Sequence, residues 1–365
     1  MLRGLTRVTG PAHGRPGTAT GSPDPERERV LVRGWAERCY PARCIAPCGR
    51  RCGNGGVMAL YLVTGGCGFI GSHLVEALAA AGHRVRILDD LSTGKRANVA
   101  TDLDVRVGDV GDAADVDAAA AGVDGIFHLA AVASVTRSNE DWRGTHRTNL
   151  TGTVNVLEAA RRANRGGPAP VVYASSAAVY GDPESIPLAE DAPVKPLTAY
   201  GADKLGSELH ARVAQLVHGV PTTGFRFFNV YGPRQDPSSP YSGVISIFSA
   251  KVVQGQPVQV FGDGHQVRDF VYVGDVVKHL VAAMRKTPTS PAVYNVCTGK
   301  RTTVRELAAL LMKIARRDVE VIQQPPRAGD IKLSLGNPAR ATAALGEFAT
   351  VPLEEGLART LAWQK

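Results

Sequence analysis

The sequence has no hydrophobic run approaching the roughly 18 consecutive apolar residues that cross a bilayer, so we expect no membrane partner. Cysteine is also scarce, since only Cys67 and Cys297 lie outside residues 1–57, and two thiols make no disulfide framework. We expect both to be small buried side chains without a redox role. With 44% hydrophobic and 21% charged residues, the composition is otherwise that of a globular protein.

Lysine is absent from residues 1–57, which instead hold ten arginines and four acidic residues. This segment carries +6 of the formal net charge of +8, so the rest of the chain is nearly neutral and no nucleic-acid partner is expected. Its Arg, Pro and Gly content, without an apolar period, predicts a disordered extension. Because Met58 follows it, an upstream start codon is the other reading.

Four cysteines of that segment have the spacing of no paired C-x-x-C knuckle, and we therefore expect no metal site. They are Cys39, Cys44, Cys48 and Cys52.

From Met58 onward, short β-rich runs alternate with helical patterns. The runs read ALYLVTG, RVRILDD, VRVGDV, GIFHLAA and PVVYASS. This alternation predicts an α/β fold with a Rossmann-type doubly wound parallel sheet over residues 58–230. Residues 231–365 are less regular, and we expect mainly a smaller C-terminal substrate-binding α/β domain, interleaved with the first. Ligands of such sheets bind beyond the carboxyl ends of the strands.

The stretch LVTGGCGFIGSHLVEAL joins an apolar strand to an amphipathic helix through a glycine-rich turn. Gly65, Gly68 and Gly71 have G-x-x-G-x-x-G spacing, which lets backbone N–H groups and a helix N-terminus approach a pyrophosphate. An ordinary glycine-rich turn is the alternative, because the chain holds 40 glycines. The pattern favours a dinucleotide site.

Two acidic residues at strand ends extend this hypothesis. Asp89 ends the second strand, 18 residues after Gly71, where a carboxylate accepts hydrogen bonds from an adenosine ribose. A carboxylate there repels the 2′-phosphate of NADP and favours NAD, although Lys95 and Arg96 nearby keep NADP open. Asp109, at the end of the third strand, is a candidate acceptor for the adenine amino group.

Tyr200 and Lys204 are four residues apart in a predicted helix, so their side chains share one face. A free tyrosine titrates near pH 10, but an adjacent ammonium and an oxidised nicotinamide both favour the phenolate. Tyr200 is therefore a candidate base for a sugar hydroxyl. Such pairs also occur by chance on helix surfaces, and the preceding dinucleotide turn is what favours the catalytic reading.

The order of these motifs is similar to that of the extended short-chain dehydrogenase/reductase superfamily, in particular NAD-dependent nucleotide-sugar epimerases of the UDP-glucose 4-epimerase type. The resemblance runs from Met58 to the C-terminus. It is carried by TGGCGFIGSH, LDDLSTG, GDV, HLAA, TNLTGTVNVLEAAR, YASSAAVYG, Tyr200 with Lys204, FRFFNVYGPRQ, VFGDGHQVRDFVYVGDV and RAGDIKLS.

The resemblance implies a role for further residues. Ser176 takes the place of the catalytic Ser or Thr beside Tyr200 and Lys204. The implied NAD-binding set is Gly65, Gly68, Phe69, Ile70, Gly71, Asp89, Asp109, Val110, Leu129, Ala130, Ala131, Asn149, Tyr200 and Lys204. The implied UDP-sugar set is Ser134, Ser176, Asn229, Arg268, Arg327, Asp330 and Ser334. Arginine forks suit a diphosphate, and salt bridges of Arg268 to Asp269 or of Arg327 to Asp330 are the structural alternative. His128 is expected to pack at a strand end.

The implied activity is NAD-dependent epimerisation at C4 of a UDP-hexose, UDP-glucose or UDP-galactose, through a 4-keto sugar. Ser334 replaces a bulky tyrosine of some relatives, so N-acetylated UDP-hexoses are also expected substrates. Other readings are a UDP-glucuronate epimerase or decarboxylase, a dTDP-sugar 4,6-dehydratase, or a non-catalytic NAD-binding regulatory protein. Dehydratases carry an Asp-Glu pair where this chain has Ala177 and Ala178. A cytoplasmic homodimer, paired through helices at Trp142–Arg162 and Tyr200–His218, is expected by analogy.

Overall fold

The computed structural model describes residues 50–51, 57–164, 166–237, 243–326, 331–346 and 348–364. Most of the predicted N-terminal extension, with its four cysteines, therefore lies outside the described residues, as do Arg327 and Asp330. Strand β1 (Arg50–Arg51) pairs antiparallel with β2 (Val57–Met58).

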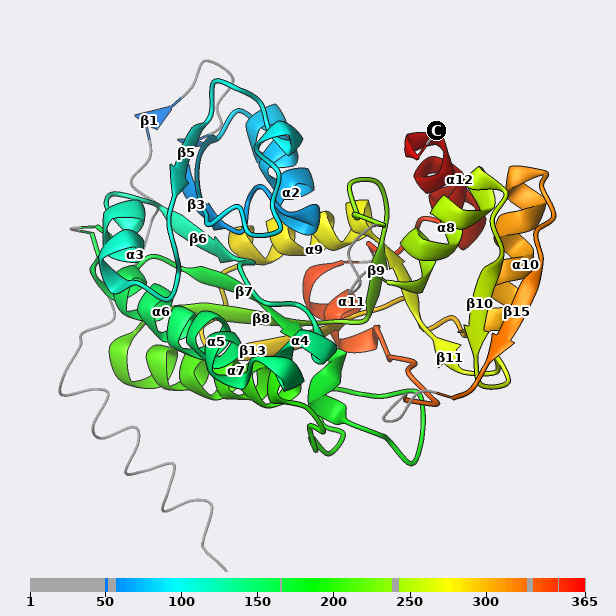
Figure 1. Cartoon of the computed structure of the whole chain (residues 1–365). Coiled ribbons are helices and arrows are strands. Elements are labelled where there is room, and N and C mark those ends of the chain that lie inside the picture. The colour runs from blue at the N-terminus through cyan, green and yellow to red at the C-terminus, as the bar shows by residue number, and fades with distance from the viewer. Residues whose placement is uncertain are drawn as a thin grey trace, which may run out of the picture. The chain divides into compact units, whose positions relative to one another are not determined.

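A seven-stranded sheet, parallel throughout, forms the centre of the described chain (Figure 1). Its order is β13-β8-β7-β6-β3-β4-β5, which confirms the predicted doubly wound arrangement, since the chain starts in the middle and winds outward both ways. The strands are β3 (Leu60–Thr64), β4 (Arg84–Asp89), β5 (Asp104–Val107), β6 (Gly125–His128), β7 (Val171–Ser176), β8 (Thr222–Phe227) and β13 (Ala292–Val296).

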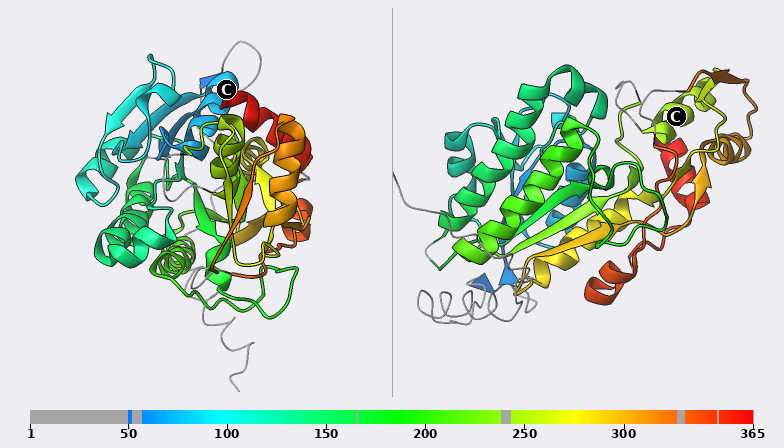
Figure 2. Two further views of the ribbon diagram at one scale, coloured as in Figure 1. Left: turned by 45° about the vertical axis from the view of Figure 1, so that its right-hand side comes forward. Right: turned by 90° about the horizontal axis from the view of Figure 1, so that it is seen from below.

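Helices cover both faces of this sheet, as the views in Figure 2 show. Neighbouring strand residues point to opposite faces, so Val63 belongs to one buried core and Leu62 to the other. The Val63 core is shared with α2 (Phe69–Ala80), α9 (Val273–Arg285) and α11 (Ala339–Leu345). The Leu62 core is shared with α3 (Ala113–Ala120), α6 (Gly152–Arg162) and α7 (Ala199–His218).

The predicted helix Trp142–Arg162 is a helical run with three parts. It comprises α5 (Trp142–His146), the π-helical turn η2 (Arg147–Thr151) and α6, and the short helix α4 (Val135–Glu140) precedes it. The predicted helix Tyr200–His218 is α7, which begins one residue earlier because the Thr198 side chain accepts from the Gly201 N–H. Gly219, in the left-handed conformation, ends it.

A second core lies beyond the sheet, packed between α8 (Val244–Gln254), α10 (Val304–Ala315) and α12 (Leu353–Trp363). Three strand pairs border it: β9 (Asn229–Tyr231) with β12 (Phe270–Tyr272), β10 (Val258–Phe261) with β15 (Val321–Gln324), and β11 (Val267–Arg268) with β14 (Thr302–Thr303). Helix α9 and strand β13 return to the large sheet, so the chain crosses between the two parts more than once. The domain boundary at residue 230 stays a prediction.

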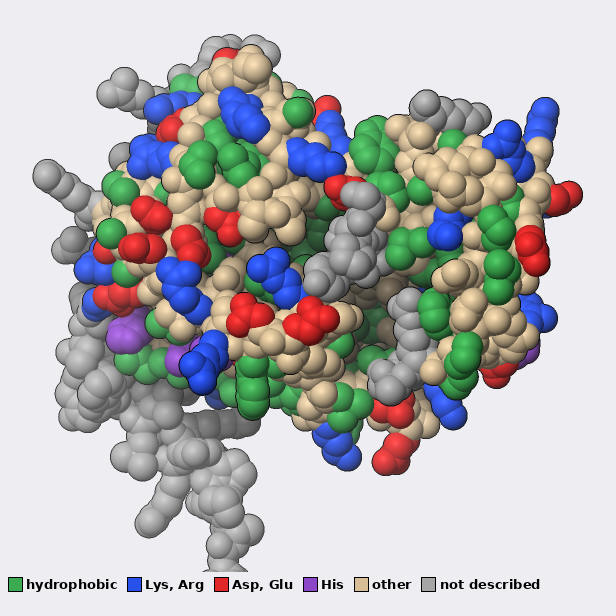
Figure 3. All heavy atoms as spheres, viewed as in Figure 1, with side chains coloured by type: hydrophobic (Ala, Val, Ile, Leu, Met, Phe, Trp, Pro, Cys, Tyr) green, Lys and Arg blue, Asp and Glu red, His purple; other side chains and the backbone are tan. Residues whose placement is uncertain are grey.

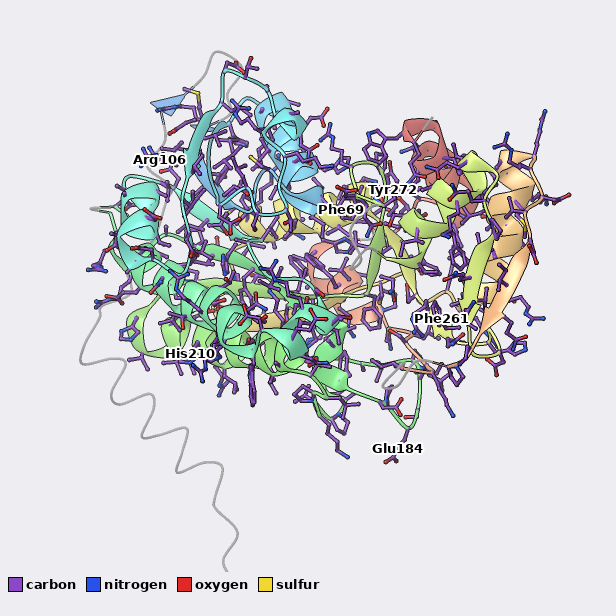
Figure 4. All side chains as sticks on the ribbon, viewed as in Figure 1. Phe69, Arg106, Glu184, His210, Phe261 and Tyr272 are labelled. Atoms are coloured by element: carbon purple, nitrogen blue, oxygen red, sulfur yellow. The ribbon has the colours of Figure 1, made fainter. Side chains whose placement is uncertain are left out.

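Phe69 and Ile70, at the start of α2, pack against this second core (Figure 4). The glycine-rich turn that precedes them is thereby held between the two parts of the fold. Two short 3₁₀ turns, η1 (Arg96–Asn98) and η3 (Ala177–Tyr180), complete the elements that frame the site.

Candidate active site

A cavity of about 470 Å³ opens where the strands of the large sheet end (Figure 3). Its walls come from the loops after β3, β4, β5, β6, β7 and β8, at the carboxyl edge where such sheets bind ligands. The sequence-predicted residues that line it are Gly65, Gly68, Phe69, Ile70, Gly71, Asp89, Asp109, Val110, Leu129, Ala130, Ala131, Ser176, Tyr200, Lys204 and Asn229.

Two glycines of the turn, Gly65 and Gly71, leave no room for a side chain. Gly65 has φ +69°, and a Cβ there would lie 2.7 Å from the Ala130 nitrogen. A Cβ on Gly71 would lie 2.1 Å from the Gly65 oxygen. Gly68 is the N-cap of α2, no side chain caps it, and no acidic residue stands in the first turn. The helix N-terminus is thus open to an anion, and the residues fit the pyrophosphate of a dinucleotide.

The Asp89 carboxylate, only 6% exposed, is fixed at the cavity wall by backbone donors. Its Oδ1 accepts from the Leu91 N–H and its Oδ2 from the Cys67 N–H, both at 2.9 Å. Burial raises the pKa of Asp89, and these two hydrogen bonds oppose the rise. A fixed acceptor at this place suits a ribose hydroxyl.

The two cations that kept NADP open have partners in the structure. Lys95 Nζ lies 2.6 Å from Asp236 Oδ2. Arg96 donates to the backbone oxygens of Val99 and Ala100, at 3.1 and 2.9 Å. With both cations engaged beside the Asp89 carboxylate, the geometry favours NAD.

Ser176, Tyr200 and Lys204 meet at one end of the cavity. The N-terminus of α7 brings Tyr200 to Ser176 at the end of β7, and the two side chains share a hydrogen bond. Lys204 Nζ lies 5.9 Å from the Tyr200 ring centroid and donates to the Ala174 oxygen at 2.9 Å. Burial raises the pKa of Tyr200, and the bond to Ser176 opposes that rise. Burial lowers the pKa of Lys204 to about 8.

A buried polar chain supports the wall formed after β6. Thr64 Oγ1 accepts from the N–H groups of Leu129 and Ala130, both at 3.2 Å, and lies 2.8 Å from His128 Nδ1. His128 Nε2 lies 3.1 Å from Thr153 Oγ1. Burial lowers the pKa of His128 to about 3, so the ring is neutral. The prediction that His128 packs rather than faces substrate is confirmed, because it is 3% exposed.

A buried ion pair lies behind Ser176. Arg226 on β8 and Glu208 on α7 are 2.8 Å apart and each is 7% exposed. The Ser175 hydroxyl donates to Glu208, and Arg226 also donates to the Tyr180 hydroxyl at 2.9 Å. The ion pair joins β8 to the helix that carries Tyr200 and Lys204, and the bond from Ser175 joins the end of β7 to the same helix.

Among the predicted residues that the structure describes, four do not line the cavity. Asn149 is fully buried and bonds both polar groups of Val132, with Oδ1 accepting at 2.8 Å and Nδ2 donating at 3.2 Å. Ser134 caps α4 by accepting from the Arg137 N–H. Arg268 donates to the Ile331 oxygen at 2.7 Å, and the Ser334 N–H donates to the Val267 oxygen. Asn149 therefore acts on the wall through Val132.

Several lining residues were not predicted from the sequence. They are Asp90, Ser92, Thr93, Gly94, Arg137, Thr148, Gln235 and Gly243, among others. The motif LDDLSTG contains four of them and was the available signal. Asp109 was predicted as an adenine contact, and the structure pairs it with Arg147, a contact with no signal in the sequence.

Both predicted buried thiols, Cys67 and Cys297, are free and buried. Within the ranges described, no three His, Cys, Asp or Glu side chains gather as metal ligands would. Every helix in that same part of the chain is too short or too polar to cross a membrane.

Known proteins are similar to this chain in sequence and fold over most of its length. The model of the NAD dependent epimerase/dehydratase family matches residues 61–297. UDP-glucose 4-epimerase of Mycolicibacterium smegmatis is 39% identical over 307 residues, 82% of this chain and 96% of that protein. The crystal structure of UDP-glucose 4-epimerase with UDP-glucose from Thermotoga maritima has a TM-score of 0.79 at 36% identity, covering 83% and 98% of the two chains. The structure of Thermus thermophilus UDP-glucose 4-epimerase in complex with NAD has a TM-score of 0.76 at 37% identity, and the match covers 84% of this chain and 98% of that one.

Proposed function

This chain belongs to the NAD dependent epimerase/dehydratase family, and from that premise we propose that it epimerises a UDP-hexose at C4, with NAD as cofactor. The observation that carries the proposal is the meeting of Ser176, Tyr200 and Lys204 in the cavity that the glycine turn borders. A protein that only sensed NAD would need no base. The similarity to epimerases with UDP-glucose and with NAD supports the substrate and the cofactor.

The chemistry assigns one role to each of the three residues. Bound NAD supplies the oxidising and reducing equivalents for C4. Tyr200, as phenolate, takes the proton of the 4-hydroxyl, and Ser176 holds the same oxygen by a hydrogen bond. The Lys204 ammonium would favour the Tyr200 phenolate through its positive charge and would hold the cofactor ribose by a hydrogen bond. The resulting 4-keto sugar turns in the site, and Tyr200 returns the proton when the opposite epimer forms.

The UDP-sugar contacts are assigned on the same premise. Asn229, which lines the cavity, is the contact for the sugar or diphosphate, and Arg268 supplies a cation for the diphosphate. Ser134 and Ser334 complete the sugar side. Arg327 and Asp330, outside the described residues, are proposed for the uridine side.

Dehydration across C5 and C6 needs a further acid and base. The residues after Ser176 are Ala177 and Ala178, which transfer no proton, so the chain lacks that pair. This observation favours epimerisation over the 4,6-dehydratase reading. Decarboxylation of a UDP-uronate would use the same three residues. Its product is a UDP-pentose, whereas epimerisation gives another UDP-hexose, so product analysis distinguishes the two reactions.

We propose that the protein forms a homodimer, with the helices from α5 through α7 at the interface between the two copies. Four large apolar side chains of α7 are exposed on the side of the helix away from its buried face, and Trp142 on α5 is 70% exposed. The four are Leu209, Val213, Leu216 and Val217. A helix face of this kind is typical of an association surface. The homodimer is tested by measuring the molar mass of Val213→Glu and of the parent protein by light scattering. A parent protein that is monomeric at micromolar concentration would contradict it.

We also propose that the protein resides in the cytoplasm, where UDP-sugars and NAD are both available.

The function is tested by incubating the protein with single UDP- and dTDP-sugars, without added NAD, and identifying the products by NMR. Interconversion of UDP-glucose and UDP-galactose is expected. A pentose product, a 6-deoxy-4-keto product or no turnover would each contradict the proposal.

A further inference from the structure

Three side chains on one face of α7 are each bonded to the end of β7. They are four residues apart along the helix, a spacing that places them on the same face. The three contacts are Lys204 Nζ with the Ala174 oxygen, Glu208 with the Ser175 hydroxyl, and Tyr200 with the Ser176 side chain. The proposed chemistry gives a role to Tyr200 and Lys204 and leaves the contact between Glu208 and Ser175 without one.

The Glu208 carboxylate is held by donors from two strands. Its Oε1 accepts from the Ser175 hydroxyl and from Arg226 Nε at 2.9 Å, and its Oε2 accepts from Arg226 Nη2 at 2.8 Å. Glu208 is 7% exposed and Ser175 is 1% exposed. Two parallel bonds between a guanidinium and a carboxylate set the relative orientation of both groups. A shift of Glu208 would therefore break bonds to both β7 and β8.

Arg226 extends this fixation to the residues that follow Ser176. Its Nη1 donates to the Tyr180 hydroxyl and to the Glu190 backbone oxygen, both at 2.9 Å. Tyr180 belongs to η3, which begins directly after Ser176, and its hydroxyl donates to Asn295 Oδ1 at 2.7 Å. The residue before Ser176 and the turn after it are thus both bonded to the same buried ion pair.

This ion pair contributes geometry more than stability. The desolvation of a buried pair roughly offsets its attraction, so well-packed apolar residues of the same volume would stabilise the fold as well. Such residues would give the Ser175 hydroxyl no acceptor. Glu208 does not line the cavity, and the hydroxyl of Ser175, which does line it, is bonded to Glu208. The contact therefore acts on the reaction through the position of its neighbours.

We propose that Glu208 is a positioning residue for the reaction: by accepting from Ser175 it fixes α7 against the end of β7. That placement brings the Ser176 and Tyr200 hydroxyls to the same substrate oxygen. An error of about 1 Å in such a placement costs about 10²-fold in rate. The inference rests on the proposed function, because it assumes that Ser176 and Tyr200 act together on the 4-hydroxyl.

The first test is Ser175→Ala, which removes the bond to Glu208 and leaves the ion pair with Arg226 in place. We expect kcat for UDP-glucose to fall by about 10-fold, because the two hydroxyls shift by less than the 1 Å that costs about 10²-fold. KM should stay within about twofold, since no group that binds substrate is removed. The matched control, Thr360→Val, removes a buried hydroxyl of α12 and should keep the parent kcat. An unchanged kcat in Ser175→Ala, or an equal fall in Thr360→Val, overturns the inference.

The second test removes the ion pair without leaving a buried charge. Glu208→Met combined with Arg226→Met keeps side chains of similar length, so we expect the fold to be retained and the urea midpoint to stay near that of the parent protein. The value of kcat should still fall by about 10-fold, because Ser175 has lost its acceptor. A double variant that folds and turns over at the parent rate overturns the inference. If the double variant does not fold, Ser175→Ala decides.

The third test measures Ser175→Ala in the background of Ser176→Ala. The contact that Glu208 is proposed to position is already absent there, so the added substitution should lower kcat by at most about twofold. A merely structural defect would multiply with Ser176→Ala and cost about 10-fold again. That result overturns the inference.

Hydrogen exchange gives a readout that needs no turnover. Amides in the first two turns of α7 should exchange faster in Ser175→Ala than in the parent protein, and at the parent rate in Thr360→Val. Equal exchange in all three proteins overturns the inference. If the parent protein does not turn over UDP-glucose, the proposed function is contradicted, and the exchange rates alone decide whether Ser175 and Glu208 fix the position of α7.

Discussion

Lys95 Nζ lies 2.6 Å from Asp236 Oδ2, which joins the loop after β4 to the loop after β9. The preceding residues of the two loops, Gly94 and Gln235, both line the cavity. The ion pair therefore fastens two walls of the site to each other. Both side chains are partly exposed, at 60% and 33%, so the pair is screened by solvent.

The reaction cycle and the ion pair together bear on how NAD is held. The purified protein should carry NAD and be active without added cofactor, because the reaction cycle regenerates it. Asp236→Asn should speed NAD release by at most about fivefold, since an exposed ion pair contributes about 1 kcal/mol or less. Stopped-flow or filtration measurement of NAD release checks this at low and high salt. A parent protein that is active yet contains no nicotinamide after denaturation would contradict retention.

The proposed base is tested by Tyr200→Phe. Removing the phenol should lower kcat by about 10² or more, while binding of UDP and NAD survives because the ring and its packing remain. Steady-state kinetics and calorimetric UDP binding give the two numbers. An unchanged kcat would remove Tyr200 from the mechanism.

Alanine substitutions at two glycines of the turn should reduce stability by different amounts. Gly71→Ala should destabilise the fold by about 1–3 kcal/mol or more and abolish NAD retention, because its Cβ would stand 2.1 Å from a backbone oxygen. Gly68→Ala, whose Cβ would meet its nearest atom at 3.2 Å, should cost less stability. Urea unfolding of both variants measures the order, and equal losses would show that the close contact is not what demands glycine.

His128 predicts a loss of stability in acid. The folded protein keeps His128 neutral down to a pKa of about 3, whereas the unfolded chain protonates it near its ordinary pKa of 6.5. Between those values the unfolded state binds the extra proton, so the free energy of unfolding falls as pH falls, by up to about 1.4 kcal/mol per pH unit.

The hydrogen bonds explain why protonation is resisted. Thr64 Oγ1 already accepts from two N–H groups, so it donates to His128 Nδ1, which a protonated ring could not accept. Urea unfolding at a series of pH values from 7 to 4 gives the free energy of unfolding at each pH. This free energy should fall less steeply with falling pH in His128→Asn than in the parent protein. His210→Asn, on the outer side of α7 in Figure 4, is the matched control and should keep the parent slope. Equal slopes in all three proteins would exclude His128 as the source.

Ser334 predicts the range of sugars. A serine leaves space that a tyrosine ring would fill, so UDP-N-acetylglucosamine should be a substrate alongside UDP-glucose. Ser334→Tyr should depress kcat/KM for the N-acetylated sugar selectively, and kinetics with both sugars measure the ratio. An equal loss on both sugars would place Ser334 away from the C2 substituent.

The parts of the fold that the sequence predicts are those written in local patterns. Parallel strands are buried on both faces and therefore read as short apolar runs, and the spacing of Tyr200 and Lys204 follows from the helical repeat. The π-helical turn Arg147–Thr151 was not predicted, because it lies inside one continuous helical run with α5 and α6 and differs from them in its hydrogen-bond pattern.

Contacts between residues that are far apart in the sequence were not predicted from the sequence. Lys95 and Asp236, or His146 and Asp203, come together only because the sheet and its helices fold back on each other. Asn149 shows the same limit, since it matches a cofactor motif and yet bonds the backbone of Val132. A motif identifies the residue, and the fold decides which atoms it meets.

The most direct test of the central claim is proton NMR of the purified full chain with UDP-galactose as the only added substrate. We expect UDP-glucose to appear without added NAD, the same equilibrium ratio to be reached from UDP-glucose, and Tyr200→Phe to slow the approach to equilibrium by about 10² or more. A spectrum in which UDP-galactose persists unchanged, or is converted to anything other than its C4 epimer, would contradict it.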